Sequence, residues 1–158
     1  MIATPTAIDG VLVLDVAPRV DERGSFARLL DVEQLRDHGL AFVVRQQNLS
    51  TTALAGTVRG LHLQRAPHEE AKLVRCVRGA ILDVAVDVRP GSPTWGRHVA
   101  VELSAANHRA LLVPRGCAHG FQALAEDTAV EYLVSAPYAP DAEDGYRHDD
   151  PAFAIEWP

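Results

Sequence analysis

Short runs of β-forming residues recur along almost the whole chain, and many of them end at turn residues. They cover residues 11–16, 42–49, 57–63, 72–78, 80–88, 98–103, 109–113, 120–124 and 128–134. A chain of 158 residues has the length of one ordinary domain. So many strands in one domain predict an all-β fold, either a sandwich or a barrel, over residues 1–158.

The tightest connection between two of these runs lies at Arg78-Gly79. It predicts a β-hairpin between residues 73–77 and 81–86, because a short loop containing glycine commonly joins antiparallel neighbours. Asp83 and Asp87 interrupt the apolar pattern of the second strand.

One helix is predicted, over residues 32–38. Asp31 is suited to cap its N-terminus, Gln34 stands in the capping-box position, and Gly39 follows the last turn. With about two turns, this helix is peripheral to the β-core. The tail from 136 to 158 is rich in proline and acidic residues, which predicts irregular chain or short helical turns.

The charge balance is acidic, with 15 Lys and Arg against 21 Asp and Glu and a net charge of -6. Proteins that bind nucleic acids need a basic surface, so this balance argues against such a partner. An anionic small molecule held by a few local arginines remains compatible with it.

Cys76 and Cys117 are the only cysteines, which excludes a framework of several disulfides and a four-cysteine zinc site. A reducing cytoplasm is the simplest compartment for such a chain. No run approaches the roughly 18 to 20 apolar residues that span a bilayer, and the N-terminus does not read as a secretion signal. We therefore expect a cytoplasmic protein without a membrane segment.

The densest cluster of polar side chains in strand-like sequence runs from Arg59 to Gln64. In a regular strand Arg59 and His62 point to opposite faces, because side chains alternate. Both reach one pocket only if Gly60 marks a bulge or if the strand begins after Arg59, and an isolated strand glycine often marks such a break. The cluster is therefore either a solvent-facing strand edge or part of a polar cavity.

Two more titratable residues lie at notable places. His119 begins a strand after a turn, where a metal ligand, a substrate contact and a hydrogen-bonded core residue are all compatible with the pattern. Tyr132 shares a strand face with Val130 and Val134, which points its ring into the barrel. There it is either a packed core aromatic or a catalytic group.

A metal centre needs three or four suitable ligands, often with two on one strand face. Gly60 and Gln64 occupy the positions two residues on either side of His62, where a same-face ligand would lie, and His68 follows in a predicted loop. This pattern argues against a catalytic metal. Motifs typical of serine hydrolases, phosphate-binding loops and dinucleotide-binding turns do not occur in the sequence.

Taken in order, several segments resemble the dTDP-4-dehydrorhamnose 3,5-epimerase family, the sugar-nucleotide epimerases of the cupin superfamily. The resemblance spans about residues 8–158 and rests on DERGSF (21–26), VRGLHLQ (58–64), KLVR (72–75), DVAVD (83–87), SPTWG (92–96), LSA (103–105), PRGCAHGF (114–121) and YAP (138–140). It implies a cupin-type jelly-roll barrel with short peripheral helices, usually paired as a homodimer. It implies neither a metal nor another cofactor.

The implied substrate is a dTDP-4-dehydro-6-deoxyhexose, inverted at the carbons beside its 4-keto group during deoxysugar biosynthesis. A proton next to a ketone can be removed when a base lies against it and a cation or donor meets the enolate oxygen. A proton then returns from the opposite face. By resemblance, His62 matches the base, Lys72 the residue facing the C4 oxygen, and Tyr132 the acid on the far side.

Seven further residues match substrate contacts of the family. They are Arg23 and Arg59 at the diphosphate, Phe26 and Tyr138 around the thymine, and Gln46, Asn48 and His119 as polar contacts in the pocket. The guanidinium fork of arginine suits a diphosphate, which would account for anion binding by an acidic protein.

Family members commonly continue past Glu156-Trp157-Pro158 and carry in that extension an aspartate that hydrogen-bonds the catalytic histidine. In the present sequence we expect this usual partner to be missing, unless Asp83, which matches another acid of the family pocket, holds His62 by itself. Such a partner sets the histidine tautomer and raises its basicity.

Three positions depart from the family pattern and leave alternative reactions open. Leu133 stands where a lysine is common, Cys117 replaces a larger aromatic, and Arg28 stands where an acid is usual. The first hypothesis is a cofactor-independent epimerase acting at C3, C5 or both. The second is a relative with altered proton chemistry, such as a mono-epimerase, an isomerase or cyclase, or a nucleotide-sugar binding protein. A metal-dependent cupin enzyme is the third.

Overall fold

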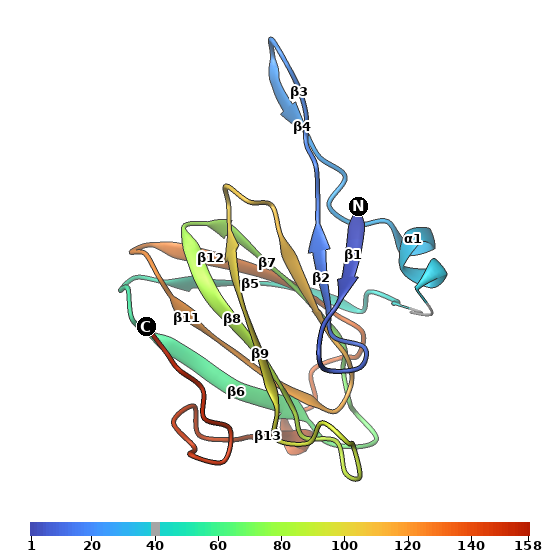
Figure 1. Cartoon of the computed structure of the whole chain (residues 1–158), viewed down its shortest axis with the longest axis vertical. Helices are drawn as coiled ribbons and strands as arrows, with labels where there is room; N and C mark the ends of the chain where they lie inside the picture. The colour runs from blue at the N-terminus through green and yellow to red at the C-terminus, as the bar shows by residue number, and fades with distance from the viewer. Residues whose placement is uncertain (39–41) are drawn as a thin grey trace.

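A computed structural model describes residues 1–38 and 42–158, and in it two antiparallel β-sheets pack face to face (Figure 1). The six-stranded sheet has the order β1-β2-β10-β7-β12-β5, and the five-stranded sheet has the order β13-β6-β11-β8-β9. Many neighbouring strands are far apart in the sequence, as in a jelly roll. The predicted all-β, cupin-type jelly roll is confirmed.

The strands of the six-stranded sheet are β1 (Ile2–Pro5), β2 (Leu12–Asp15), β10 (Ala110–Val113), β7 (Lys72–Arg78), β12 (Thr128–Val134) and β5 (Gln46–Thr52). Those of the five-stranded sheet are β13 (Glu143–Gly145), β6 (Val58–Gln64), β11 (Cys117–Ala123), β8 (Ala80–Asp87) and β9 (His98–Ser104). The other elements are β3 (Arg19–Asp21), β4 (Gly24–Phe26), the helix α1 (Val32–Asp37) and the 3-10 helix η1 (Pro140–Ala142).

The main hydrophobic core lies between the two sheets. Alternate side chains of both sheets enter it, among them Val74 and Cys76 of β7, Ala85 of β8, Cys117 of β11 and Val130 of β12. Burial of this apolar surface contributes about 25 cal/mol per Å² and holds the sheets together. Both cysteines are buried with free thiols.

The outer faces of the two sheets are also covered. Leu35 of α1 and Phe42 pack on the outside of the six-stranded sheet, against residues such as Leu73. Phe153 packs on the outside of the five-stranded sheet, against residues that include Leu61 of β6. The walls of the barrel are therefore supported from behind as well as from inside.

The predicted hairpin at Arg78-Gly79 is wrong. Although β7 and β8 are consecutive, β7 pairs with β10 and β12, whereas β8 pairs with β9 and β11. Gly79 has a φ of 77°, and a Cβ there would lie 2.6 Å from Thr128 Oγ1, so glycine lets the chain cross from one sheet to the other. Both strands face the same core, and their apolar pattern therefore looks like that of a hairpin.

The predicted strands agree with the structure at most positions. Strands β7 and β12 have the predicted bounds, but β5 begins at Gln46 rather than at residue 42, and β11 begins at Cys117 rather than at residue 120. The short strands β1, β3, β4 and β13 were not predicted, because mostly exposed residues in segments of three or four carry no clear alternation.

Helix α1 forms where the sequence predicts it. The Asp31 side chain accepts hydrogen bonds from the backbone N–H groups of Glu33 and Gln34. The side-chain oxygen of Gln34 is buried without a partner among the described residues, so the capping box is not completed. The predicted end at Gly39 lies outside the described residues. None of the helices in the described chain is long and apolar enough to span a bilayer.

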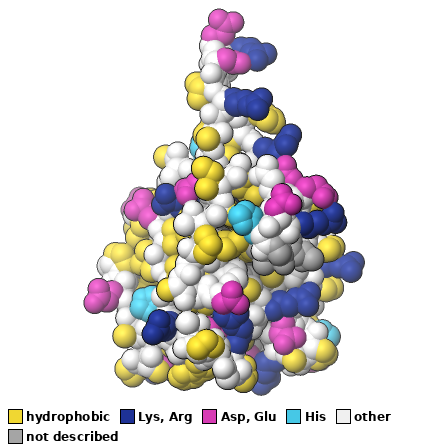
Figure 2. Space-filling view, turned by 45° about the vertical axis from the view of Figure 1, so that its right-hand side comes forward, with side chains coloured by type: hydrophobic (Ala, Val, Ile, Leu, Met, Phe, Trp, Pro, Cys, Tyr) yellow, Lys and Arg dark blue, Asp and Glu magenta, His cyan; other side chains and the backbone are white. Residues whose placement is uncertain are grey.

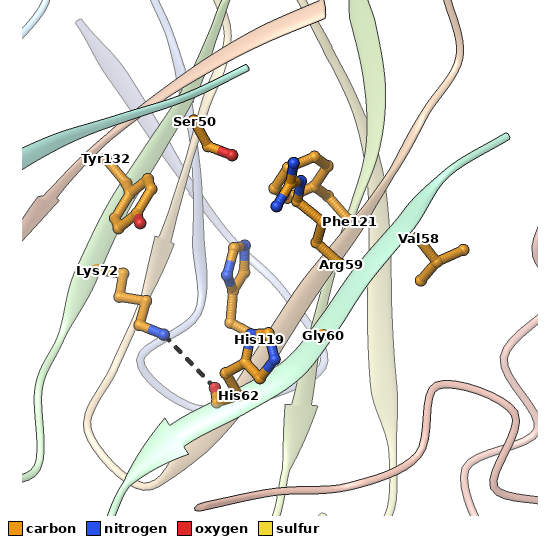
Figure 3. A pocket seen from close by; sticks show the side chains of 9 residues that line it. All are labelled: Ser50, Val58, Arg59, Gly60, His62, Lys72, His119, Phe121 and Tyr132. Carbon is orange, nitrogen blue, oxygen red and sulfur yellow. Dashed lines mark hydrogen bonds between the residues drawn. The ribbon is translucent and has the colours of Figure 1, made fainter. Parts of the chain in front are cut away.

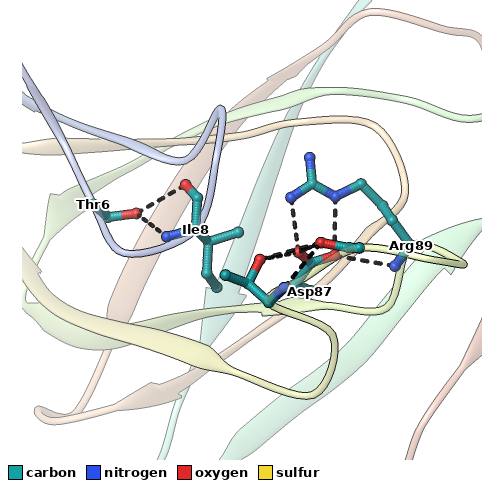
Figure 4. Close-up of polar contacts among 6 residues, drawn as sticks. Thr6, Ile8, Asp87 and Arg89 are labelled. Atoms are coloured by element: carbon teal, nitrogen blue, oxygen red, sulfur yellow. Dashed lines mark hydrogen bonds and ion pairs between the residues drawn. The ribbon is translucent and has the colours of Figure 1, made fainter.

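The connection from β8 to β9 is organised around the fully buried carboxylate of Asp87 (Figure 4). It accepts hydrogen bonds from Arg89 Nε at 2.9 Å, Arg89 Nη2 at 2.8 Å and Ser92 Oγ at 2.6 Å. Thr94 Oγ1 donates another at 2.5 Å. Burial alone would raise the pKa of Asp87, but these hydrogen bonds outweigh it and hold the pKa well below its ordinary value.

Strands β3 and β4 form an arm, residues 19–26, that projects from the barrel (Figure 1). In the described chain these two strands pair only with each other. Side chains of both charges line the arm (Figure 2), and Val20 and Phe26 are 77% and 67% exposed. An isolated two-stranded hairpin is marginally stable in water, so the arm is expected to gain stability from a further contact.

Candidate active site

A polar cavity with two lobes lies between the sheets. The first lobe has a volume of about 410 Å³ and the second of about 390 Å³. Both are lined by His62, Lys72 and Tyr132, which therefore stand where the lobes meet. Figure 3 shows these three side chains around the first lobe, with Arg59 and Phe121 on its other side.

A break in β6 brings Arg59 and His62 into this cavity together. His62 is opposite His119 and Arg59 is opposite Phe121, so β6 has one more residue than β11 between the two pairs. Gly60 lies at this bulge with a φ of 137°, and a Cβ there would be 2.5 Å from Gly120 Cα. Of the alternatives left open by the sequence, the structure has the bulge at Gly60, which allows both side chains to face one pocket.

The proton-transfer candidates come from facing walls. His62 is on β6 of the five-stranded sheet, whereas Lys72 and Tyr132 are on β7 and β12 of the six-stranded sheet. Tyr132 packs against the cluster that contains Val130, as the alternation of β12 predicts, and its ring lines the cavity. A ligand between the sheets would therefore have histidine on one side and tyrosine on the other.

Asp83 occupies a different place from the one expected. Its Oδ1 lies 2.8 Å from His119 Nε2, and no hydrogen bond joins it to His62 within the described residues. His62 is opposite His119 on the neighbouring strand β11, and Asp83 of β8, which is opposite Phe121, reaches His119 diagonally. The alternative in which Asp83 holds His62 by itself is therefore wrong, because β11 lies between their two strands and Asp83 bonds to His119 instead.

Burial and neighbouring charges move the proton affinities of these groups in opposite directions. Burial lowers the pKa of His62, and the positive charge of Lys72 lowers it further. Burial raises the pKa of Tyr132, and the carboxylate of Glu70 raises it further. Complete burial also raises the pKa of Asp83, against the opposing effect of His119. His62 is thus favoured as a neutral acceptor and Tyr132 as a protonated donor.

Arg59 is held in place by β5. Its Nε donates to Thr52 Oγ1 and its Nη2 donates to the Thr51 carbonyl oxygen, both at 3.0 Å. A guanidinium has five N–H donors, so this anchoring leaves donors for an anion in the cavity. The residue is exposed at the cavity wall, which suits a phosphate contact.

The second lobe contains three of the predicted substrate contacts, Gln46, Asn48 and Tyr138. Gln46 Oε1 accepts a hydrogen bond from the backbone N–H of Tyr138 at 2.7 Å. The Tyr138 hydroxyl donates to Glu143 Oε2 at 2.5 Å, and its ring is exposed at the lobe. An aromatic ring fixed at both ends offers a flat surface for a planar ligand group.

Arg23 and Phe26 do not line the cavity of their own chain. Both belong to the arm, where Arg23 Nη2 lies 2.7 Å from Asp21 Oδ2. The structure thus brings together the predicted residues on the barrel and leaves the two predicted residues on the arm apart from them.

Several cavity residues were not predicted. They are Ser50, Phe121, Gln64, Glu70 and Glu143. Ser50 follows Gln46 and Asn48 at spacings of two on β5, so extending that alternation would have identified it. Glu143 lies on the unpredicted strand β13, and Glu70 reaches the cavity from a loop, for which the sequence carries no periodic signal.

Over residues 1–38 and 42–158, no group of three or more His, Cys, Asp and Glu side chains is arranged to hold a metal ion. The chemistry offered by the described cavity is proton transfer by histidine and tyrosine beside a lysine cation. With its jelly-roll fold, this makes the chain a cupin-type protein whose site suits acid–base chemistry on a small ligand.

Known proteins are similar to this chain in both sequence and fold. The family model for dTDP-4-dehydrorhamnose 3,5-epimerase matches residues 5–158. A dTDP-4-dehydrorhamnose 3,5-epimerase from Sinorhizobium fredii is 49% identical over 138 residues, covering 87% of this chain and 71% of the relative. The chain belongs to the dTDP-4-dehydrorhamnose 3,5-epimerase family.

Solved structures of related epimerases have the same fold as this chain. The Mycobacterium tuberculosis epimerase superposes with a TM-score of 0.96 at 40% identity, over 100% of this chain and 79% of that one. A 3′-monoepimerase from Streptomyces bikiniensis, solved in complex with dTDP-quinovose, superposes with a TM-score of 0.91 at 37% identity, over 98% and 78%. Family membership therefore includes relatives named for inversion at one carbon as well as at two.

Proposed function

We propose that this chain is a cofactor-independent epimerase of a dTDP-4-dehydro-6-deoxyhexose, acting at C3, C5 or both. The observation that supports this most is the position of His62 and Tyr132 on facing sheets of one cavity, with Lys72 between the lobes. Inversion at a carbon requires a proton to leave one face and return to the other. Two groups on opposite walls meet that requirement without moving the sugar ring.

In the proposed reaction His62 removes the proton from a carbon next to the 4-keto group. The electron pair moves to the C4 oxygen, and the ammonium of Lys72 stabilises the resulting enolate. Tyr132 then donates its hydroxyl proton to the opposite face of the carbon, and solvent exchange restores both groups. The lowered pKa of His62 and the raised pKa of Tyr132 favour these starting protonation states.

The nucleotide part of the substrate is assigned to arginines and aromatic rings. Arg59 pairs with the diphosphate, Tyr138 stacks on the thymine, and Gln46, Asn48 and His119 supply polar contacts in the two lobes. Arg23 and Phe26 act in the cavity of a second copy, which gives a homodimer with exchanged arms. The exposure of Phe26 and the marginal stability of a lone hairpin support this arrangement.

Residues 1–158 act in this proposal as one epimerase domain, because the cavity takes residues from strands throughout the chain. We place the reaction in the cytoplasm, where the two buried free thiols would remain reduced.

Deuterium exchange from solvent into a dTDP-4-dehydro-6-deoxyhexose tests the proposed reaction. Wild-type protein in D2O should incorporate deuterium at C3, C5 or both, as observed by NMR. His62→Asn should lower the exchange rate by about 10²- to 10⁴-fold, since a general base contributes on that order. His108→Asn is the matched control, because His108 does not line the cavity and asparagine tolerates its φ of 53°.

Exchange at a single carbon would identify a mono-epimerase within the same proposal. Binding of the nucleotide sugar without exchange at either carbon would overturn it in favour of a nucleotide-sugar binding protein. Full exchange by His62→Asn would show that another residue is the base.

A further inference from the structure

Glu70 makes an ion pair with Lys72 inside the cavity wall. Its Oε1 lies 3.2 Å from Lys72 Nζ, and the two side chains are only 12% and 11% exposed. Glu70 stands just before β7, in the loop that follows β6, and Gln64 Nε2 approaches its other oxygen at 3.4 Å. A pair so far removed from water is held more firmly than a surface salt bridge, in which both side chains move freely.

The pair limits where the Lys72 ammonium can point. An ammonium has three donors on a flexible four-carbon stem. Its Nζ forms an ion pair with Glu70 at 3.2 Å and donates a hydrogen bond to the His62 carbonyl oxygen at 3.5 Å. Among the described residues these are the polar partners of Lys72 Nζ, so at least one of its three donors remains for a ligand oxygen in the cavity.

The charges of Lys72 and Glu70 also shift the pKa values of the two proton-transfer groups, His62 and Tyr132. The positive charge of Lys72 lowers the pKa of His62, and the negative charge of Glu70 raises the pKa of Tyr132. Neither effect is the largest one, because burial contributes more in both cases. Both add to burial, however, and so favour a neutral histidine and a protonated tyrosine.

We propose that Glu70 is a positioning residue of the epimerase reaction, which holds the Lys72 ammonium toward the substrate's C4 oxygen. This role rests on the function proposed above. Glu70 acts through Lys72 and Tyr132 and does not itself exchange a proton with the sugar. The charged and titratable groups that share the two lobes with Tyr132 are Arg59, His62, Glu70, Lys72, His119, Tyr138 and Glu143.

The test compares Glu70→Gln with Glu69→Gln. Both replace a carboxylate by an amide of equal size in the same loop, but Glu69 does not line either lobe. Glu70→Gln should reduce kcat for deuterium exchange by roughly 10- to 100-fold, because misplacing one group by about 1 Å has effects of that order. KM should change less than twofold, and the alkaline limb of the pH profile should move to lower pH because Tyr132 loses a neighbouring negative charge. Glu69→Gln should match the wild type.

Glu70→Asp separates geometry from charge. It keeps the carboxylate but shortens its reach, so kcat should fall while the alkaline limb stays near its wild-type position. It also provides the measurement if Glu70→Gln does not fold, as judged by dTDP binding and thermal unfolding. Wild-type kcat and an unmoved alkaline limb in Glu70→Gln, or wild-type kcat in Glu70→Asp, would overturn the proposal. If wild-type protein exchanges no deuterium, the proposed function is wrong and the role of Glu70 in it falls as well.

Discussion

The protonation of His62 depends on several side chains from both sheets. Burial is the largest influence and lowers its pKa, followed by the positive charge of Lys72. The negative charge of Glu143 raises the pKa and partly opposes them, whereas His119 adds a smaller lowering effect. The result is a pKa below the ordinary histidine value of 6.5, so the imidazole is neutral and able to accept a proton at neutral pH.

The pH profile of exchange should show this balance. Protonation of His62 inactivates the base, and because its pKa is lowered, the acidic limb of kcat/KM should fall at a pH below 6.5. Glu143→Gln removes the charge that raises this pKa, so it should move the acidic limb to still lower pH. Initial rates of deuterium exchange, measured across the acidic pH range for the wild type and Glu143→Gln, test both predictions. An acidic limb above pH 6.5, or a shift to higher pH in Glu143→Gln, would contradict this account.

Individual site residues differ in how far sequence could identify them. Alternation along β12 predicts that Tyr132 points inward with Val130, and the structure agrees. For Arg59 and His62 alternation alone gives opposite faces, and only Gly60 indicates the break that unites them. The partner of Asp83 could not be predicted, because sequence spacing does not tell which strand lies beside β8.

At the scale of elements, the close approach of β6 and β11 controls the active-site geometry. Gly60 and Gly120 face each other there, and a Cβ on Gly120 would lie 2.8 Å from the Arg59 carbonyl oxygen. Side chains at these positions would push the strands apart. The bulge that directs Arg59 and His62 into one cavity therefore depends on two glycines from different strands.

Gly60→Ala should destabilise the protein by about 3 kcal/mol or more, because it combines an unfavourable φ with overlap against the backbone of β11. Gly56→Ala is the matched control: its φ is also positive at 81°, but nothing lies within 4 Å of a Cβ there. Backbone strain alone should cost about 1–2 kcal/mol in that variant. Urea unfolding of both variants measures the difference, and equal losses would show that the contact with Gly120 is unimportant.

Elements were predictable where a strand is long and has one buried face. Strands β7 and β12 illustrate this, whereas the crossing at Gly79 was mistaken for a hairpin turn. A local pattern shows which residues face a core but not which sheet supplies the strand's neighbours. The arm strands β3 and β4 were not predicted, because their residues are all exposed and show no alternation between buried and exposed positions.

At the scale of the whole molecule, the proposed exchange of arms can be tested by co-expressing two variants, each with a different defect. Arg23→Ala damages the arm and His62→Asn damages the cavity. If each arm serves the other copy, a co-expressed mixture contains dimers in which an intact arm meets an intact cavity. With random pairing of two equally expressed chains, about a quarter of wild-type activity should return.

A mixture of His62→Asn and Lys72→Ala provides the control, because both defects lie in the cavity and no pairing restores an intact one. Light scattering should confirm a dimer in every sample. Recovery in neither mixture would show that the arm serves its own chain, whereas wild-type activity of Arg23→Ala alone would show that the arm does not act in the site. Recovery in the control would show that the complementation has another cause.

The support behind both walls of the barrel bears on which motion limits turnover. Phe153 packs behind β6, and Leu35 and Phe42 pack behind the six-stranded sheet, so the strands that carry His62 and Lys72 are supported from outside the barrel. The arm has no such backing within the described chain. We therefore expect proton transfer to occur in a nearly rigid enclosure, while arm movement admits the nucleotide sugar and releases it. Solvent viscosity should then slow turnover more than it slows the chemical step measured in a single turnover.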